Sequence, residues 1–241
     1  MGSSTTPANA RQHQPVASSG HFAFMLLIQA GLVGYGFYLQ HRPENGGSVL
    51  PQSRNILPFY LSIIALEWAL VATVRGAIRN KGITLWELIG GRWKSWKDAF
   101  LDVAICVPFI AVWEGSAWLM HRVLGPDSAR SVDTMLPRSA IEIALWIVVS
   151  LSAGICEEIV YRGYFQKQFA AYTNSVAAAV VLQGIVFGVG HSYQGMKQAA
   201  IITVLGILYG CLAAWRKNLR VNMMSHAWSD IWSGWLSGVL R

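Results

Sequence analysis

Seven long apolar stretches constrain the fold of this chain more than any other feature of the sequence. They cover residues 21–40, 56–75, 99–121, 139–160, 175–191, 197–215 and 221–240. Each is close to the ~20 residues that a helix needs to cross about 30 Å of hydrocarbon. They lack the alternating pattern of membrane strands, and backbone polar groups must be satisfied inside lipid. The sequence therefore predicts an all-α polytopic transmembrane bundle of about seven helices, with an eighth, re-entrant or split element left open.

The composition argues against an ordinary soluble enzyme. Of the 241 residues, 54% are hydrophobic and 13% are charged, which is more apolar than a typical water-soluble domain. The formal net charge is +7, but the 19 Lys and Arg lie mostly between the apolar stretches and form no single basic face. We therefore expect membrane lipids as partners and no nucleic acid. The oligomeric state is not predicted.

The basic residues also predict an orientation. Most of them fall on the side of the N-terminus, which the positive-inside rule places in the cytosol. The chain is then a multi-pass integral membrane protein of a bacterial inner membrane or, in a eukaryote, of the endoplasmic reticulum. Residues 1–20 are predicted as a disordered polar tail and residues 21–138 as N-terminal transmembrane helices. Within these, residues 82–98 combine Trp with Arg and Lys, as in a segment lying on the membrane surface.

Charged side chains within the apolar stretches are candidates for function, because each costs about 2.5–3.5 kcal/mol near the membrane centre. One group lies in Cys156-Glu157-Glu158-Ile159-Val160-Tyr161-Arg162. Glu158 and Arg162 are four residues apart and should share one helical face as an ion pair. Glu157 points about 100° away, so it is free to face a water or a metal.

The other polar groups follow on later helices. His191 ends Phe187-Gly188-Val189-Gly190-His191, and His226 lies four residues before Asp230. The polar turn around Asn174 should reverse the chain, with Glu157 17 residues before it and His191 17 after it. At 1.5 Å per residue both reach a similar depth and could face each other. His226 reaches that depth only if residues 166–175 project beyond the bilayer.

In this order, the Glu-Glu-x-x-x-Arg, Phe-x-x-x-His and His-x-x-x-Asp series resembles the CAAX prenyl protease and bacteriocin-processing (CPBP, Abi) family of intramembrane endopeptidases. The resemblance covers about residues 139–235 and implies a catalytic transmembrane core at 139–241. It implies hydrolysis of a peptide bond in a membrane-associated or lipid-modified protein or peptide.

The resemblance also implies roles for the individual residues. Glu157 would be the general base on a water that His191 helps to bind and orient. Arg162 would hold Glu158, while His226 and Asp230 would line the substrate carbonyl and its developing oxyanion. Many relatives have Asn at the last position. Asp230 is thus open to three roles: a protonated donor, a group that orients His226, or a cation ligand.

The cofactor requirement is open at this point. Glu157, His191 and His226 could form the three-ligand site of a hydrolytic divalent metal, most plausibly zinc. A metal-free glutamate mechanism is slightly favoured, because the sequence has no H-E-x-x-H pair.

A competing hypothesis is a non-catalytic membrane protein, either a bacteriocin-immunity factor or a transporter. A transporter should show internal repeats with broken helices, which the sequence lacks.

Two further patterns concern packing. Gly-x-x-x-Gly pairs predict close packing of the last three helices, and they are Gly184 with Gly188, Gly206 with Gly210, and Gly234 with Gly238. Three acidic residues in apolar runs match no motif, and we expect them to form interhelical hydrogen bonds or, as the alternative, to line the active-site cavity: Glu67, Glu114 and Glu142.

Overall fold

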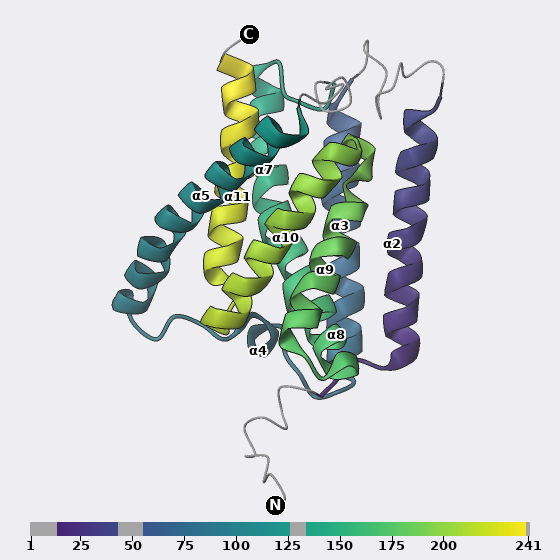
Figure 1. The fold of residues 1–241 in the computed structure, drawn as a ribbon, viewed down its shortest axis with the longest axis vertical. Helices are drawn as coiled ribbons and strands as arrows, with labels where there is room; N and C mark the ends of the chain where they lie inside the picture. The colour runs from purple at the N-terminus through teal and green to yellow at the C-terminus, as the bar shows by residue number, and fades with distance from the viewer. Residues whose placement is uncertain (1–13, 43–54, 126–133, 240–241) are drawn as a thin grey trace, which may run out of the picture.

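The computed structural model describes residues 14–42, 55–125 and 134–239, with side chains of the last helix as far as Trp235. Within these residues every regular element is a helix (Figure 1). The α-helices are α2 (Ser19–Gln40), α3 (Leu57–Arg79), α4 (Leu85–Ile89), α5 (Trp96–Leu124), α7 (Ala140–Glu157), α8 (Gln166–Thr173), α9 (Val176–Gly190), α10 (Met196–Arg216) and α11 (Arg220–Val239). A π-helix, η2 (Glu158–Phe165), joins α7 to α8, and a 3-10 turn, η3 (Ser192–Gln194), precedes α10. All seven predicted stretches are helical, which confirms the all-α bundle.

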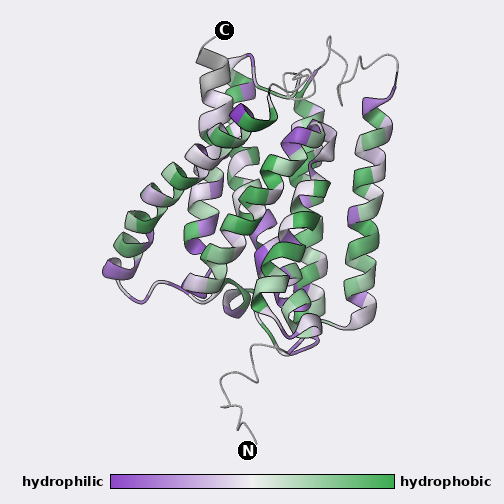
Figure 2. Cartoon of the chain, in the orientation of Figure 1, coloured by the Kyte–Doolittle hydropathy of each residue, from purple (hydrophilic) through white to green (hydrophobic). Residues whose placement is uncertain are grey.

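Five helical runs are long and apolar enough to cross a membrane. They are α2, α3, α5, α10 and the continuous run Ala140–Thr173. Helix α9 is apolar but has only 15 residues, and α11 has 20 residues but is not among the five. Many large apolar side chains are exposed, and those of Leu27, Val107 and Val123 are more than 65% exposed. The helices at the edges of the bundle are hydrophobic along much of their length (Figure 2). The chain is therefore a multi-pass membrane protein whose outer surface faces lipid.

The helices form a bundle with α9 packed along α10, and with α11 and α3 both packed on α7. Helix α2 lies at one edge, where it contacts α9 and η3, and α5 crosses the opposite edge against α11 and α10 (Figure 1). Serines begin several helices by accepting a hydrogen bond from a backbone N–H of the first turn, as at Ser139 and Ser175. Asn174, with φ 51°, turns the chain between α8 and α9 as predicted.

The fourth helical run is longer than its hydropathy predicted, because it continues past residue 160 to Thr173. The residues after 160 are polar, but they are buried and have partners. Gln166 donates to the carbonyl oxygen of Gly210 at 3.1 Å, and Gln168 donates to that of Ala17 at 3.3 Å. Tertiary partners therefore keep the helix intact where the apolar pattern stops. In Figure 1 the α8–α9 turn extends past the start of α11.

The contact between Gln168 and Ala17 also corrects the N-terminal tail. Val16 and Ala17 are buried, and Ala17 both donates to and accepts from the Gln168 side chain. Residues 14–20, predicted within a disordered tail, are thus ordered against α8. Residues 1–13 lie outside the described part of the chain.

The predicted surface segment 82–98 contains α4 and the start of α5. Thr84 and Glu87 form a capping box, in which the Thr84 backbone N–H donates to the Glu87 carboxylate at 2.7 Å. This hydrogen bond holds the pKa of Glu87 below its usual value. Gly90 then turns with φ 95°, and a Cβ there would lie 2.5 Å from the Lys217 carbonyl oxygen. Glycine is required because α4 meets the α10–α11 link at this point.

Two of the three glycine pairs bring α9 and α10 together as predicted. A Cβ on Gly206 would lie 2.9 Å from the Gly184 Cα, and one on Gly188 would lie 2.6 Å from the Ala199 carbonyl oxygen. Gly234 instead faces the Trp146 indole of α7. Gly234 therefore allows close packing of α11 on α7. The surroundings of Gly238 lie outside the described side chains.

The unassigned acidic residues have three different environments. Glu67 of α3 accepts a hydrogen bond from Ser152 of α7 at 2.6 Å, which confirms the interhelical prediction. Glu142 accepts from the backbone N–H of Arg138 at 2.7 Å, so it caps its own helix and the prediction was wrong there. Glu114 is exposed on α5 and forms no hydrogen bond with another described residue.

Candidate active site

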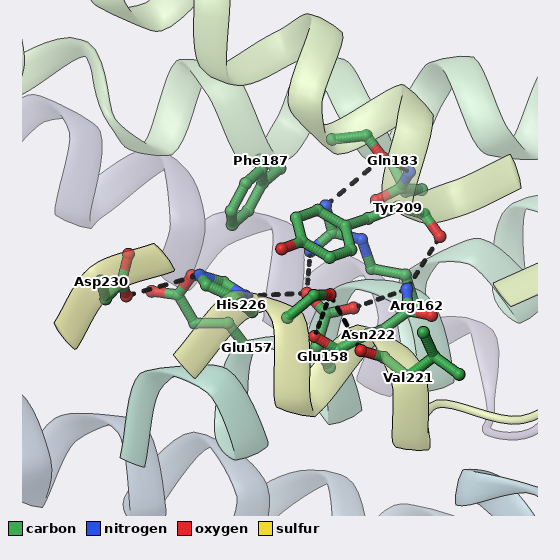
Figure 3. Close-up of polar contacts among 12 residues, drawn as sticks. Glu157, Glu158, Arg162, Gln183, Phe187, Tyr209, Val221, Asn222, His226 and Asp230 are labelled. Carbon is green, nitrogen blue, oxygen red and sulfur yellow. Dashed lines mark hydrogen bonds and ion pairs between the residues drawn. The ribbon is translucent and has the colours of Figure 1, made fainter. Parts of the chain in front are cut away.

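A buried carboxylate, that of Glu158, is the centre of the polar cluster inside the bundle (Figure 3). Its Oε1 accepts from Arg162 Nη1 at 2.8 Å and contacts His226 Nδ1 at 2.9 Å. Its Oε2 accepts from Asn222 Nδ2 at 3.1 Å, and the same amide donates to the Tyr209 carbonyl oxygen at 2.8 Å. A buried charge is tolerable only when it is paired and hydrogen-bonded, and here each oxygen has a donor. The predicted Glu158–Arg162 ion pair is thus formed, and it carries additional partners from α10 and α11.

The Arg162 guanidinium lies close to two aromatic rings. Its Cζ lies 4.3 Å from the ring centre of Phe187 and 5.1 Å from that of Tyr209. Nη2 donates to the Gly206 carbonyl oxygen at 3.3 Å. A planar delocalised cation can stack on aromatic rings in a way that a lysine ammonium cannot.

The two adjacent glutamates sit on different kinds of helix. Glu157 is the last residue of α7, and Glu158 is the first residue of the π-helix, all of whose eight residues are buried. Short π-helical segments are rare and occur frequently at functional sites. Here the segment directs Glu158 into the bundle while Glu157 faces a cleft.

That cleft has a volume of about 310 Å³ and is lined by α2, α3, the α7–η2 junction and the end of α9. Glu157 and His191 both line it, as the depth argument predicted. Glu67 and Tyr161 share the same wall, and Tyr161 donates to Gln29 of α2 at 3.0 Å. The Glu157 Oε2 atom is buried and has no hydrogen-bond partner among the described residues. A carboxylate oxygen in this state can accept a hydrogen bond from a water or a substrate.

His226 connects Glu157 to the buried cluster. Its Nε2 lies 3.6 Å from Glu157 Oε2 and 3.7 Å from Asp230 Oδ2. The ring stacks on Tyr209 at 5.5 Å between centres and meets the edge of Phe187 at 6.1 Å. With Nδ1 bound to Glu158, the imidazole has one orientation, and its free nitrogen points toward Glu157 and Asp230.

His191 is the residue that ends α9. Its Nδ1 lies 2.8 Å from the Phe187 carbonyl oxygen, and because a carbonyl only accepts, this nitrogen is the donor. The neutral ring then has Nε2 as an acceptor on the cleft side. The six predicted residues thus fall into two groups. His226 contacts Glu157, Glu158 and Asp230, and Glu158 contacts Arg162, while His191 shares the cleft with Glu157.

The geometry does not assemble the three metal ligands considered from sequence. Among the described residues, no group of three or more His, Cys, Asp or Glu is placed to hold a metal ion. His226 Nδ1 contacts Glu158, and its Nε2 lies 3.6 Å from Glu157 Oε2. The metal requirement stays a prediction, and no step below is assigned to a metal.

Sequence reasoning missed one polar residue of this site. Asn222 bridges Glu158 and Tyr209, and it lies four residues before His226, a spacing that places both on one face of α11. Glu67, which forms the predicted interhelical hydrogen bond, also lines the cleft beside Glu157.

Comparison with known proteins gives a family match over the part of the chain that contains this cluster. The family model of type II CAAX prenyl endopeptidase Rce1-like proteins matches residues 139–232, a range that contains all six predicted site residues. Curated proteins and solved structures give no match. The matched range begins with α7 and ends within α11, so it covers the helices that build the cluster around Glu158. Residues 139–232 are therefore similar to the type II CAAX prenyl endopeptidase Rce1-like family.

Proposed function

We propose that this protein is an intramembrane endopeptidase that hydrolyses a peptide bond of a membrane-associated or lipid-modified protein or peptide. The observation that carries the proposal is the state of Glu157. Its Oε2 is buried and has no hydrogen-bond partner among the described residues, Glu157 lines the cleft, and His226 Nε2 lies 3.6 Å from Oε2. In this proposal Glu157 is the general base that takes a proton from the attacking water.

His191 positions that water. Since Nδ1 donates to the Phe187 carbonyl, Nε2 can accept the second hydrogen of a water whose first hydrogen is directed at Glu157. The oxygen lone pair is then left to attack the substrate carbonyl carbon. Glu157, once protonated, can deliver its proton to the leaving amine.

His226 and Asp230 stabilise the developing oxyanion. Because Nδ1–H is donated to Glu158, His226 has an N–H on Nε2 only as the doubly protonated imidazolium, and in this proposal that N–H points into the site. A preorganised donor of this kind favours the tetrahedral state over the planar carbonyl. Of the three roles left open for Asp230, we propose that it orients His226, because its Oδ2 lies 3.7 Å from Nε2. Glu158 holds the opposite nitrogen and Arg162 neutralises Glu158, so both are positioning residues.

The walls of the cleft support an apolar or lipid-modified substrate. Besides the polar residues, they contain Leu32, Tyr35, Ile63, Leu66 and Leu70 from α2 and α3. An extended peptide next to a lipid chain would find apolar contacts there, and its scissile carbonyl would meet the polar end.

The test is cleavage of a panel of membrane-tethered peptides by the full-length protein in detergent or vesicles. Glu157→Gln should lower the cleavage rate at least a hundredfold, and His191→Ala should have a comparable effect. Glu114→Gln is the matched control, because it removes another glutamate charge from a transmembrane helix outside the site. Size exclusion and thermal unfolding would confirm that each variant is folded.

Full activity of Glu157→Gln would contradict the proposed base and favour a non-catalytic binding protein. Treatment of the wild type with a chelator separates the remaining mechanisms. The metal-free proposal expects unchanged cleavage, whereas loss of activity with recovery on adding zinc would show that a metal is required.

We also propose that the N-terminus is cytosolic. The end of α3, the surface segment 82–98 and the α10–α11 link lie at the same end of the bundle (Figure 1). That end carries Arg79, Lys81, Arg216 and Lys217, the charges retained inside by the positive-inside rule. Reporter fusions to the N-terminus would test this orientation.

A further inference from the structure

A second and larger cavity opens at the proposed cytosolic end of the bundle. It has a volume of about 790 Å³ and lies between the end of α3, α4, the η2–α8 region and the α10–α11 link. It shares no lining residue with the cleft that contains Glu157. Its function is therefore a separate question from peptide hydrolysis.

The charges around this cavity are mostly positive. Lys81 follows α3, Lys167 belongs to α8, and Lys217 follows α10, so three separate segments bring an ammonium group to one space. Glu87 is the single carboxylate of the lining, and its Oε2 is bound by the backbone N–H and the hydroxyl of Thr84. Among the described residues, none of the three lysines forms an ion pair with a carboxylate.

Buried polar atoms in the same wall are also unsatisfied. The Nε of Arg162 and the Oε1 of Gln166 have no hydrogen-bond partner among the described residues, although these side chains are 1% and 6% exposed. Lys167 is partly buried and uses one of its three N–H donors on the Leu88 carbonyl oxygen at 3.0 Å. Unmet polar groups of this kind in a folded protein usually indicate bound water or a ligand.

We propose that this cavity binds a phosphate-bearing anion, held by Lys81, Lys167 and Lys217. A phosphate group carries up to two negative charges and several acceptor oxygens, which match converging ammonium donors better than a single carboxylate does. The remaining walls, which include Leu88, Ala170 and Val176, are apolar and would accommodate the carbon part of such a ligand. The phosphate belongs to an anionic phospholipid headgroup or to a small soluble phosphate.

The ligand would also lie next to a residue of the catalytic cluster. Arg162 lines the cavity and is the ion-pair partner of Glu158, and its Nε has no hydrogen-bond partner among the described residues. The binding proposal does not depend on this proximity. It is tested by measuring bound ligand, and not by peptide cleavage.

The test compares two variants of the full-length protein in detergent, each lacking two positive charges. Lys81→Gln with Lys217→Gln removes the two exposed lysines of the cavity. Lys94→Gln with Lys97→Gln removes two exposed lysines of the nearby surface segment that do not line it. Native mass spectrometry would count phosphatidylglycerol that stays bound after exchange from mixed micelles. Thermal unfolding with and without glycerol 3-phosphate would report binding of a soluble phosphate.

The expected result is at least a fivefold loss of bound phosphatidylglycerol, or loss of the glycerol 3-phosphate stabilisation, in the cavity variant only. Retention of the lipid alone would identify a headgroup as the source, and stabilisation by glycerol 3-phosphate alone would identify a soluble phosphate. The proposal is overturned if the wild type binds neither probe. Equal losses in the two variants, or wild-type binding by the cavity variant, would also overturn it.

Discussion

Replacing Arg162 by Met tests whether the ion pair with Arg162 stabilises the buried Glu158 carboxylate. The substitution keeps an unbranched side chain between Phe187 and Tyr209 but removes the guanidinium at 2.8 Å from Glu158 Oε1. Removing one partner of a buried pair typically lowers stability by 3–5 kcal/mol. Because His226 and Asn222 still contact Glu158, we expect the lower end, about 3 kcal/mol, which is more than a hundredfold in the unfolding equilibrium.

Arg216→Met is the matched control. Arg216 also forms an ion pair at 2.8 Å with a fully buried carboxylate, that of Asp102. Asp102 additionally accepts from Arg220 at 2.8 Å and from the Trp93 indole at 2.8 Å, and Arg216 itself is 20% exposed. The loss of one of several donors, without stranding the charge, should cost about 1 kcal/mol.

The assay is SDS unfolding in mixed micelles, followed by the fluorescence of the 11 tryptophans. Arg162→Met combined with Glu158→Gln should recover part of the lost stability, because the stranded charge is gone. The reasoning would be refuted if Arg162→Met lowered the free energy of unfolding no more than Arg216→Met does. Absence of any recovery in the double variant would show that the loss comes from packing and not from charge.

Three further predictions concern other parts of the chain. Gly188→Ala should lower the free energy of unfolding by about 1–3 kcal/mol in the same assay, because its Cβ would overlap α10, whereas Gly115→Ala meets open space and should change it little. Glu67→Leu should cost about 1–3 kcal/mol because it leaves the buried Ser152 hydroxyl without its acceptor, while Glu67→Gln, which retains an acceptor oxygen, should cost less; equal losses would contradict this. The pKa of Glu87 is lowered in the folded protein, so the stability that its capping hydrogen bonds give is present above about pH 4.5 and is lost as the pH falls further. Hydrogen-exchange protection of α4, corrected for intrinsic rates, should therefore fall below about pH 4.5 in the wild type but not in Glu87→Gln.

The parts of the fold that the sequence predicted are those that depend on local periodicity. Apolar stretches of spanning length gave the helices, and the polar residues around Asn174 gave the turn between α8 and α9. The Glu158–Arg162 pair was predictable because both residues lie within one helical turn. The shared cleft of Glu157 and His191 followed from counting residues on either side of that turn.

The parts that were missed depend on partners far away in sequence. Helix continuation past residue 160 relies on Gln166 finding a carbonyl of α10 and on Gln168 finding Ala17. A hydropathy scale assigns each glutamine a fixed polar value, whether or not its side chain is hydrogen-bonded. The scale therefore predicts that the membrane segment ends at these glutamines. Glu142 was misread for the opposite reason: its contact is local, with the first turn of its own helix. The π-helix had no signal in the pattern used, because a single inserted residue changes the helix repeat only over a short distance.

In the proposed mechanism the two adjacent glutamates have different tasks, which require different surroundings. An acid that acts as a base must have an oxygen free for water, and Glu157 has one. An acid that fixes the histidine must not compete for that water, and Glu158 is fully buried with every oxygen engaged. Arg162 makes the second condition affordable inside lipid, and the π-helix makes both compatible in consecutive residues. A single helix thus connects the cleft to the basic cavity, because Glu157 lines the first, Arg162 lines the second, and Glu158 and His226 join them by direct contact.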